Sequence, residues 1–201
     1  MPLRATALNC TLSASPAQSS TELLAQQVLD ELARHDVTGS VVRVVDHDVR
    51  PGVELDMGDG DEWPGIRETI MASDILVLAT PTWLGQHSSV CQRVLERLDA
   101  ELSEKDEEGR LRTYGKVAVG VVVGNEDGAH HISAVLFQSL NDVGFTIPAG
   151  GVTYWNGEAM HGTDYKDLGS TPDTVASTTA TLAANAAHLA KTLAAAPYPP
   201  S

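Results

Sequence analysis

Basic side chains are scarce in this sequence of 201 residues. Lysine and arginine together number 13, against 27 aspartates and glutamates, so the formal net charge is −14. Proteins that bind nucleic acid need clustered lysine and arginine to neutralise the phosphates. The charge balance therefore argues against a nucleic-acid partner.

Cysteines and long apolar runs are also few. Cys10 and Cys91 are the two cysteines, and neither has a CxxC or metal-ligand spacing, so we expect no disulfide framework. No segment reaches the ~20 apolar residues of a membrane span, and residues 1–20 lack the apolar core of a signal peptide. We expect one acidic, cytoplasmic, globular domain over residues 1–201, with no membrane partner.

Apolar runs that resemble strands alternate with helical patterns. The expected strands are 4–10, 41–45, 74–80, 116–123 and 145–148. The third and fourth are almost continuously apolar, which is typical of parallel strands buried on both faces.

Apolar residues at helical spacing predict helices over 20–34, 66–71, 88–102 and 132–143, the last of these capped by Gly144. A final helix is expected from Thr171 as N-cap, with Pro172 in its first turn.

This alternation predicts an α/β fold with a doubly wound, five-stranded parallel sheet in the order 2-1-3-4-5. Two charged or Gly/Pro-rich segments, 48–65 and 103–115, are expected to be surface loops. In this strand order the chain reverses direction between strands 1 and 3. Ligands of such sheets bind outside the carboxyl ends of those strands.

The segment CTLSASPAQSST (10–21) follows the first strand and contains hydroxyl side chains but no charge. Helix N-termini attract anions through unsatisfied N–H groups and the helix dipole. Neither GxxxxGK[ST] nor GxGxxG is present, so a monophosphate such as that of FMN fits better than a triphosphate. Ser19 and Glu22 also have the spacing of a capping box, so Ser19 can instead serve the helix alone.

Two further loops lie at the same sheet edge. ATPTWLGQHSS (79–89) follows the third strand, and GNEDGAHH (124–131) follows the fourth. Trp83 offers a flat surface for a ring, although ordinary packing is an equally good reason for it. Together the three loops favour a flat cofactor that carries a phosphate.

With these loops, the chain resembles the flavodoxin-like superfamily, in the branch of NAD(P)H-dependent FMN and quinone reductases. The resemblance rests on three stretches, SPAQSSTELL, LVLATPTWLGQHSSVCQRVLERL and VGNEDGAHHISAVLFQSLNDVGFTIP. It implies non-covalent FMN and a homodimer or homotetramer. The resemblance places the flavin phosphate on Thr11, Ser13, Ser19, Ser20 and Thr21. It places the isoalloxazine against Pro81, Thr82, Trp83, Leu84, Gly85 and Gln86, with Gly124, Asn125, Glu126, Asp127 and Gly128 on the other side.

Other residues invite different interpretations. His130-His131 stands near Glu126 and Asp127, but adjacent helical histidines diverge, so we expect no metal site. Cys10 is expected to be a small buried residue. The segment 153–162, TYWNGEAMHG, is expected just after the last strand, where it can line the crevice or a subunit interface or merely cover the sheet edge. We favour the crevice and the interface combined.

We expect an FMN-dependent oxidoreductase that passes electrons from NAD(P)H to a quinone, flavin or similar small acceptor. Because the cofactor carries the chemistry, no catalytic side chain is required. A flavodoxin reduced by a partner protein is the alternative, and the acidic surface suits docking onto a basic reductase. A scaffold that has lost its cofactor is a third possibility.

Overall fold

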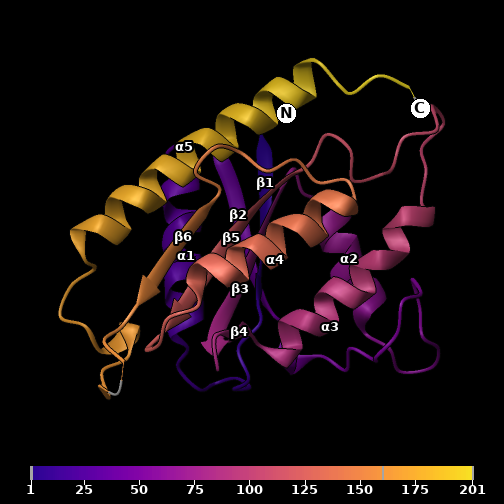
Figure 1. Cartoon of the computed structure of the whole chain (residues 1–201). Coiled ribbons are helices and arrows are strands. Elements are labelled where there is room, and N and C mark those ends of the chain that lie inside the picture. Colours follow the sequence, from indigo (N-terminus) through magenta and orange to yellow (C-terminus); the bar gives the residue numbers. More distant parts are fainter. Residues whose placement is uncertain (1, 160, 201) are drawn as a thin grey trace.

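The computed structural model describes residues 2–159 and 161–200, which form a parallel sheet between two layers of helices (Figure 1). Its long strands are β1 (Leu3–Asn9), β2 (Val37–Arg43), β3 (Ile75–Trp83), β5 (Val117–Gly124) and β6 (Val152–Asn156). They lie in the order β2-β1-β3-β5-β6, and every pairing between them is parallel. The predicted doubly wound sheet is confirmed, with one addition: the short β4 (Gln86–His87) pairs antiparallel with the end of β3.

The helices cover the sheet on both sides. They are α1 (Ser20–Ala33), α2 (Trp63–Met71), α3 (Ser89–Leu98), α4 (Ala129–Asp142) and α5 (Asp173–Ala195). Helices α1 and α5 pack together on one face, and α2, α3 and α4 cover the other (Figure 1). Short 3₁₀ turns follow β2 (Val44–Asp46), α3 (Asp99–Ser103) and the loop after β6 (Tyr165–Asp167).

Two hydrophobic clusters, one on each face, form the core. Along β3, Ile75 and Val77 point to the α1/α5 side, while Leu76 and Leu78 point to the other. This alternation follows from the period of two in a strand. Because both faces are covered, both sets are apolar, which explains the continuous apolar runs.

The last strand is not where the sequence predicted it. The prediction of a strand at 145–148 is wrong: Thr146 makes one isolated bridge to Val117, and β6 pairs 152–156 with 120–124. Pro148 has no N–H to continue a ladder. The chain turns through Gly150, whose φ is 65°, before it rejoins β5. Residues 153–156 are therefore part of the strand rather than a segment after it.

Helix ends also differ in detail. Gly144 follows α4 with a φ of 99°, as expected of a C-terminal glycine cap. Helix α3 ends at Leu98 and continues as a 3₁₀ turn, so the single helix expected over 88–102 is wrong. The expected N-cap at Thr171 is also wrong: α5 begins at Asp173, and the Thr171 hydroxyl accepts a hydrogen bond from the Gln27 amide at 2.9 Å.

Candidate functional site

A cleft of about 610 Å³ opens at the carboxyl edge of the sheet. The loops after β1, β3 and β5 and the segment after β6 surround it, at the lower edge of Figure 1. Among the residues expected at a flavin, the following line it: Thr11, Ser13, Ser19, Ser20, Thr21, Pro81, Thr82, Trp83, Gly124, Asn125 and Glu126. Leu84, Gly85, Gln86, Asp127 and Gly128 were expected there too and are not among its lining residues.

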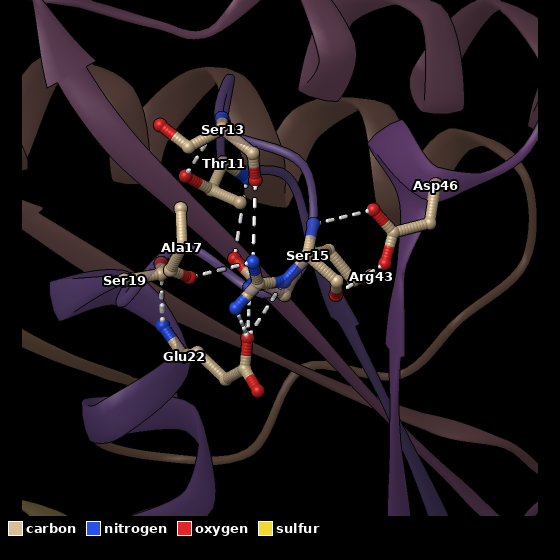
Figure 2. A network of polar contacts seen from close by, with 9 residues as sticks. Thr11, Ser13, Ser15, Ala17, Ser19, Glu22, Arg43 and Asp46 are labelled. Carbon is tan, nitrogen blue, oxygen red and sulfur yellow. Dashed lines mark hydrogen bonds and ion pairs between the residues drawn. The ribbon is translucent and has the colours of Figure 1, made fainter.

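The serine-rich loop is held from its outer side by strand β2. Figure 2 shows Arg43 reaching into the curve of the loop, where its guanidinium donates to the carbonyls of Ser13 and Ala17. Asp46 accepts hydrogen bonds from both the amide and the hydroxyl of Ser15. Arg43 of β2 and Asp46 of the 3₁₀ turn after it thus supply charged hydrogen-bond partners to a loop that has no charge of its own.

The predicted capping box is only half formed. The Ser19 hydroxyl accepts from the amide of Glu22 at 3.1 Å, so Ser19 does cap α1. In a full capping box the Glu22 carboxylate would accept from the Ser19 amide. Here it accepts instead from Asn9 and Arg43. The amide of Ser19 therefore has no acceptor among the described residues.

Several donors at the start of α1 have no acceptor. Among the described residues, the backbone amides of Gln18, Ser19, Ser20 and Thr21 donate to no partner. Thr21 is 2% exposed, and its hydroxyl forms no hydrogen bond with any described residue. The first amides of a helix always lack intrahelical acceptors, and together with the dipole they make an anion site.

The second loop is a tight hairpin between β3 and β4. Thr82 pairs with His87 and Trp83 with Gln86, which leaves Leu84 and Gly85 as a two-residue turn. Both turn residues have positive φ, 52° and 72°, as a type I′ hairpin requires. Trp83 lines the cleft and is 55% exposed.

The third loop supports this hairpin. The Glu126 carboxylate accepts from the amide of Leu84 at 2.7 Å. A Cβ atom at Gly128 would lie 2.8 Å from the Cα of Gly85, so only glycine allows the two backbones to come this close. Leu84, Gly85 and Gly128 therefore set the position of the loops that carry the lining residues.

Strand β6 and the segment after it form a wall that the sequence predicted only in part. Trp155, His161 and Gly162 line the cleft and belong to the predicted segment 153–162, whose Met160 lies outside the described residues. Sequence reasoning missed further lining residues, namely Gln18, Val123, Asp164, Tyr165 and Lys166. No motif surrounds Asp164-Tyr165-Lys166, and only the tertiary structure brings them beside the first loop.

Hydrogen bonds fix this wall in place. The side-chain amide of Asn125 donates to the Asp164 carboxylate at 2.9 Å, and the Tyr165 hydroxyl donates to the Gln27 side chain at 2.6 Å. The rings of Tyr165 and Trp155 lie 5.5 Å apart. Hydrogen bonds from Lys166 and then from Asn125 lower the pKa of Asp164, so this carboxylate stays ionised at neutral pH.

The histidines noted in the sequence have other partners. His130 lies 3.1 Å from the Tyr154 hydroxyl, and His131 lies 2.9 Å from the Gln86 side chain. Within residues 2–159 and 161–200, no group of three or more His, Cys, Asp or Glu side chains is placed to hold a metal ion. In the same residues, no helix is long and apolar enough to cross a membrane. Cys10 is buried, as is Cys91.

Two curated proteins are similar in sequence. An 8-demethyl-8-aminoriboflavin-5'-phosphate synthase of Streptomyces davaonensis is 33% identical over 208 residues, which is 98% of this chain and 81% of the synthase. The divalent metal cation transporter MntH of Mycobacterium bovis is 40% identical over 172 residues, 84% of this chain. The chain spans only 25% of the transporter's length.

Solved structures agree with the fold. RosB with a bound intermediate, 8-demethyl-8-formylriboflavin-5'-phosphate, superposes with a TM-score of 0.90 at 33% identity, covering 98% of this chain and 82% of RosB. An apo NADH:FMN oxidoreductase has a TM-score of 0.68 at 20% identity over 97% of this chain and 92% of its own, a likeness in fold alone.

The sequence profile of the NADPH-dependent FMN reductases matches residues 9–159, which include all three loops at the sheet edge. FMN is the flavin of this family, as the sequence predicted. The chain therefore belongs to the NADPH-dependent FMN reductase family.

Proposed function

We propose that the cleft holds FMN and that the protein passes electrons from NAD(P)H through FMN to a quinone, a flavin or a similar small acceptor. The observation that carries this proposal is the set of free donors at the start of α1, which opens onto a cleft of about 610 Å³. A cleft of this size, with anion-binding donors at one place, fits a cofactor that joins a flat ring to a single phosphate.

The donor set at α1 fits a phosphate monoester. The amides of Gln18 to Thr21 and the hydroxyls of Ser20 and Thr21 offer hydrogen bonds and the helix dipole. No carboxylate of the serine-rich loop competes with the anion, because residues 10–21 include no Asp or Glu.

The opposite end of the cleft fits the polar edge and the flat face of the ring. The Thr82 hydroxyl is buried without a partner among the described residues, and a ring carbonyl or ring N–H would satisfy it. Pro81 and Trp83 present apolar surface beside it. FMN supplies the hydride chemistry when it is bound, while these residues orient the ring and exclude water.

The decisive experiment is a titration of the purified protein with FMN, followed by NADH and NADPH oxidation assays with quinones and free flavin as acceptors. We expect FMN to bind, to quench tryptophan emission mainly through Trp83, and to support turnover. An FMN-loaded protein that oxidises neither nucleotide with any acceptor would contradict the proposal and favour a flavodoxin reduced by a partner.

Substitutions in the first loop test the phosphate site separately. Ser20→Ala with Thr21→Ala is expected to weaken FMN, because a hydrogen bond to a charged group contributes about 1.5–3 kcal/mol. Thr178→Ala, on the outer side of α5 with its hydroxyl bonded to Thr174, is the matched control and should leave FMN affinity unchanged. A lower melting temperature with unchanged FMN affinity would show that these hydroxyls serve only the helix.

A second candidate function is chemical modification of the flavin. The similarity to the aminoriboflavin phosphate synthase and to RosB extends over 98% of this chain, and it supports FMN as a substrate. The synthase's product carries an amino group in place of the methyl group at ring position 8. Mass spectrometry of the flavin recovered after incubation with amino donors separates the two functions, since an oxidoreductase returns FMN unchanged.

We also propose that the protein works in the cytoplasm as a homodimer or homotetramer. Two reduced, buried cysteines are typical of a reducing compartment. The exposed Trp83 and Leu84 beside the cleft offer apolar surface to a second subunit.

A further inference from the structure

The anion site at α1 has no cation from its own loop. No lysine or arginine occurs in residues 10–21. Arg43 lies close by, but its guanidinium is bonded to Glu22 and to the carbonyls of Ser13 and Ala17, and it does not line the cleft. In a protein of net charge −14, a positive side chain from another segment would strengthen the binding of a doubly charged phosphate.

Lys166, in the 3₁₀ turn after β6, lies beside the start of α1 although it is distant in the sequence. Its backbone amide donates to the Ser20 hydroxyl at 3.2 Å, which fixes the 3₁₀ turn Tyr165–Asp167 against the first turn of α1. The residue lines the cleft together with Gln18, Ser19 and Ser20. It also lines a second hollow of about 510 Å³, which shares Gln18 and Ser19 with the cleft. Its side chain is 25% exposed, so it is open to a ligand.

Two carboxylates steady the Lys166 ammonium and leave part of it free. Asp164 accepts from Nζ at 3.0 Å and Asp167 at 2.8 Å. An ammonium group carries three N–H donors, so one donor remains. Asp164 is itself held by Asn125 at 2.9 Å, which ties the lysine to the loop after β5.

We propose that Lys166 is the cation that recognises the phosphate monoester of the flavin. The inference rests on the proposed FMN site and adds a binding residue to it. The free N–H of Lys166 completes the donor set of the α1 amides, and Asp164 and Asp167 keep the ammonium beside it. Their hydrogen bonds, that of Asp167 first, raise the pKa of Lys166, so the side chain stays charged throughout the neutral range.

The charges of Lys166 and its two carboxylate partners explain why loss of the lysine would weaken the binding of a phosphate. With Lys166 present, the group of Lys166, Asp164 and Asp167 has a net charge of about −1, and one N–H of the ammonium is not used by the two carboxylates. Without it, two carboxylates remain near the phosphate with nothing to offset them. Loss of the lysine therefore removes an attraction and exposes a repulsion.

The test compares FMN with riboflavin, which has the same ring and no phosphate. Lys166→Met is expected to raise the dissociation constant for FMN about ten- to a hundredfold. Its effect on riboflavin should stay within about twofold, because the ring site is unchanged. Lys166→Arg should retain most of the preference for FMN, since the charge is kept.

Asp167→Asn separates charge from anchoring. If Lys166 acts through its charge, removing one of its two counter-ions should leave FMN binding as tight or tighter. If Lys166 only anchors the segment after β6, then Asp167→Asn should weaken FMN and riboflavin together, and so should Lys166→Met. That shared loss would overturn the proposal.

The outcomes also distinguish this inference from the proposed function. A wild-type protein that binds neither flavin would contradict the FMN site as a whole. A wild-type protein that prefers FMN to riboflavin, and keeps the same preference in Lys166→Met, would overturn the role of Lys166 alone. Melting temperatures of all variants confirm that folded protein is compared.

Discussion

At the scale of single residues, Arg97 of α3 and Asp61 form a fully buried ion pair. Their side chains are 0% exposed and joined at 2.7 Å. Arg97 also donates to the carbonyls of Arg50 and Glu54, and its guanidinium lies 5.6 Å from the centre of the Trp63 ring. The irregular segment before α2, expected to be a surface loop, is thus bound to α3 by Arg97 and also by Arg93, which donates to the carbonyl of Val49.

Removal of Arg97 should destabilise the protein strongly. Arg97→Leu leaves Asp61 buried without its partner, and losing one member of a buried pair costs about 3–5 kcal/mol. Urea unfolding measures this loss. The double variant Arg97→Leu with Asp61→Leu should lose less than the single variant, and an equal or larger loss in the double variant would contradict the argument.

The same pair predicts a dependence on pH. Burial alone would raise the pKa of Asp61, but hydrogen bonds from the Met57 amide and Arg97 outweigh it and lower the pKa to about 2. Since the unfolded pKa of aspartate is about 3.9, the folded state gains stability above that pH. We expect this gain to disappear as the pH falls from about 4 to 2. Asp61→Asn should be less stable at pH 6, and its stability should fall less than that of the wild type over this range.

At the scale of elements, the site depends on two loops in backbone contact. The β3–β4 hairpin and the turn before α4 meet at Gly85 and Gly128, and Glu126 joins them by a hydrogen bond to Leu84. Trp83, Asn125 and Glu126, which line the cleft, belong to these two loops. Their positions follow from a packing contact that lies outside the cleft.

Gly128→Ala should separate the two loops. The new Cβ would meet the backbone of Gly85 at 2.8 Å, and the φ of 148° at this position disfavours a side chain. We expect a loss of about 1–3 kcal/mol in unfolding free energy, together with weaker FMN binding. Gly58→Ala is the control, because it has a φ of 95° and nothing within 4 Å. If the control weakened FMN equally, the contact would not be the cause.

At the scale of the whole molecule, exposed apolar side chains occur in the loops that surround the cleft. Leu84 is 91% exposed, Trp83 55% and Leu12 46%. A second subunit that covers these residues would enclose the cleft further. The net charge of −14 on the molecule as a whole favours solubility.

Sedimentation should therefore show a dimer or larger assembly. Leu84→Asp is expected to shift the protein towards monomer, because it places a charge in an apolar contact. Leu102→Asp, at an exposed leucine in the 3₁₀ turn after α3 and outside the loops around the cleft, is the matched control and should leave the assembly unchanged. A wild-type protein that is monomeric at all concentrations would show the assembly prediction to be wrong.

The sequence by itself determined the sheet order and the three loops, because buried parallel strands and helix faces leave periodic apolar patterns. It also located the hydroxyls at α1 and Trp83. The tertiary structure decided where the last strand lies, because Pro148 and the glycine turn after it delay the pairing with β5. It alone brought Lys166 beside Ser20, which stands 146 residues away in the sequence. Contacts between segments so distant depend on how helices and strands pack, and no local periodicity encodes them.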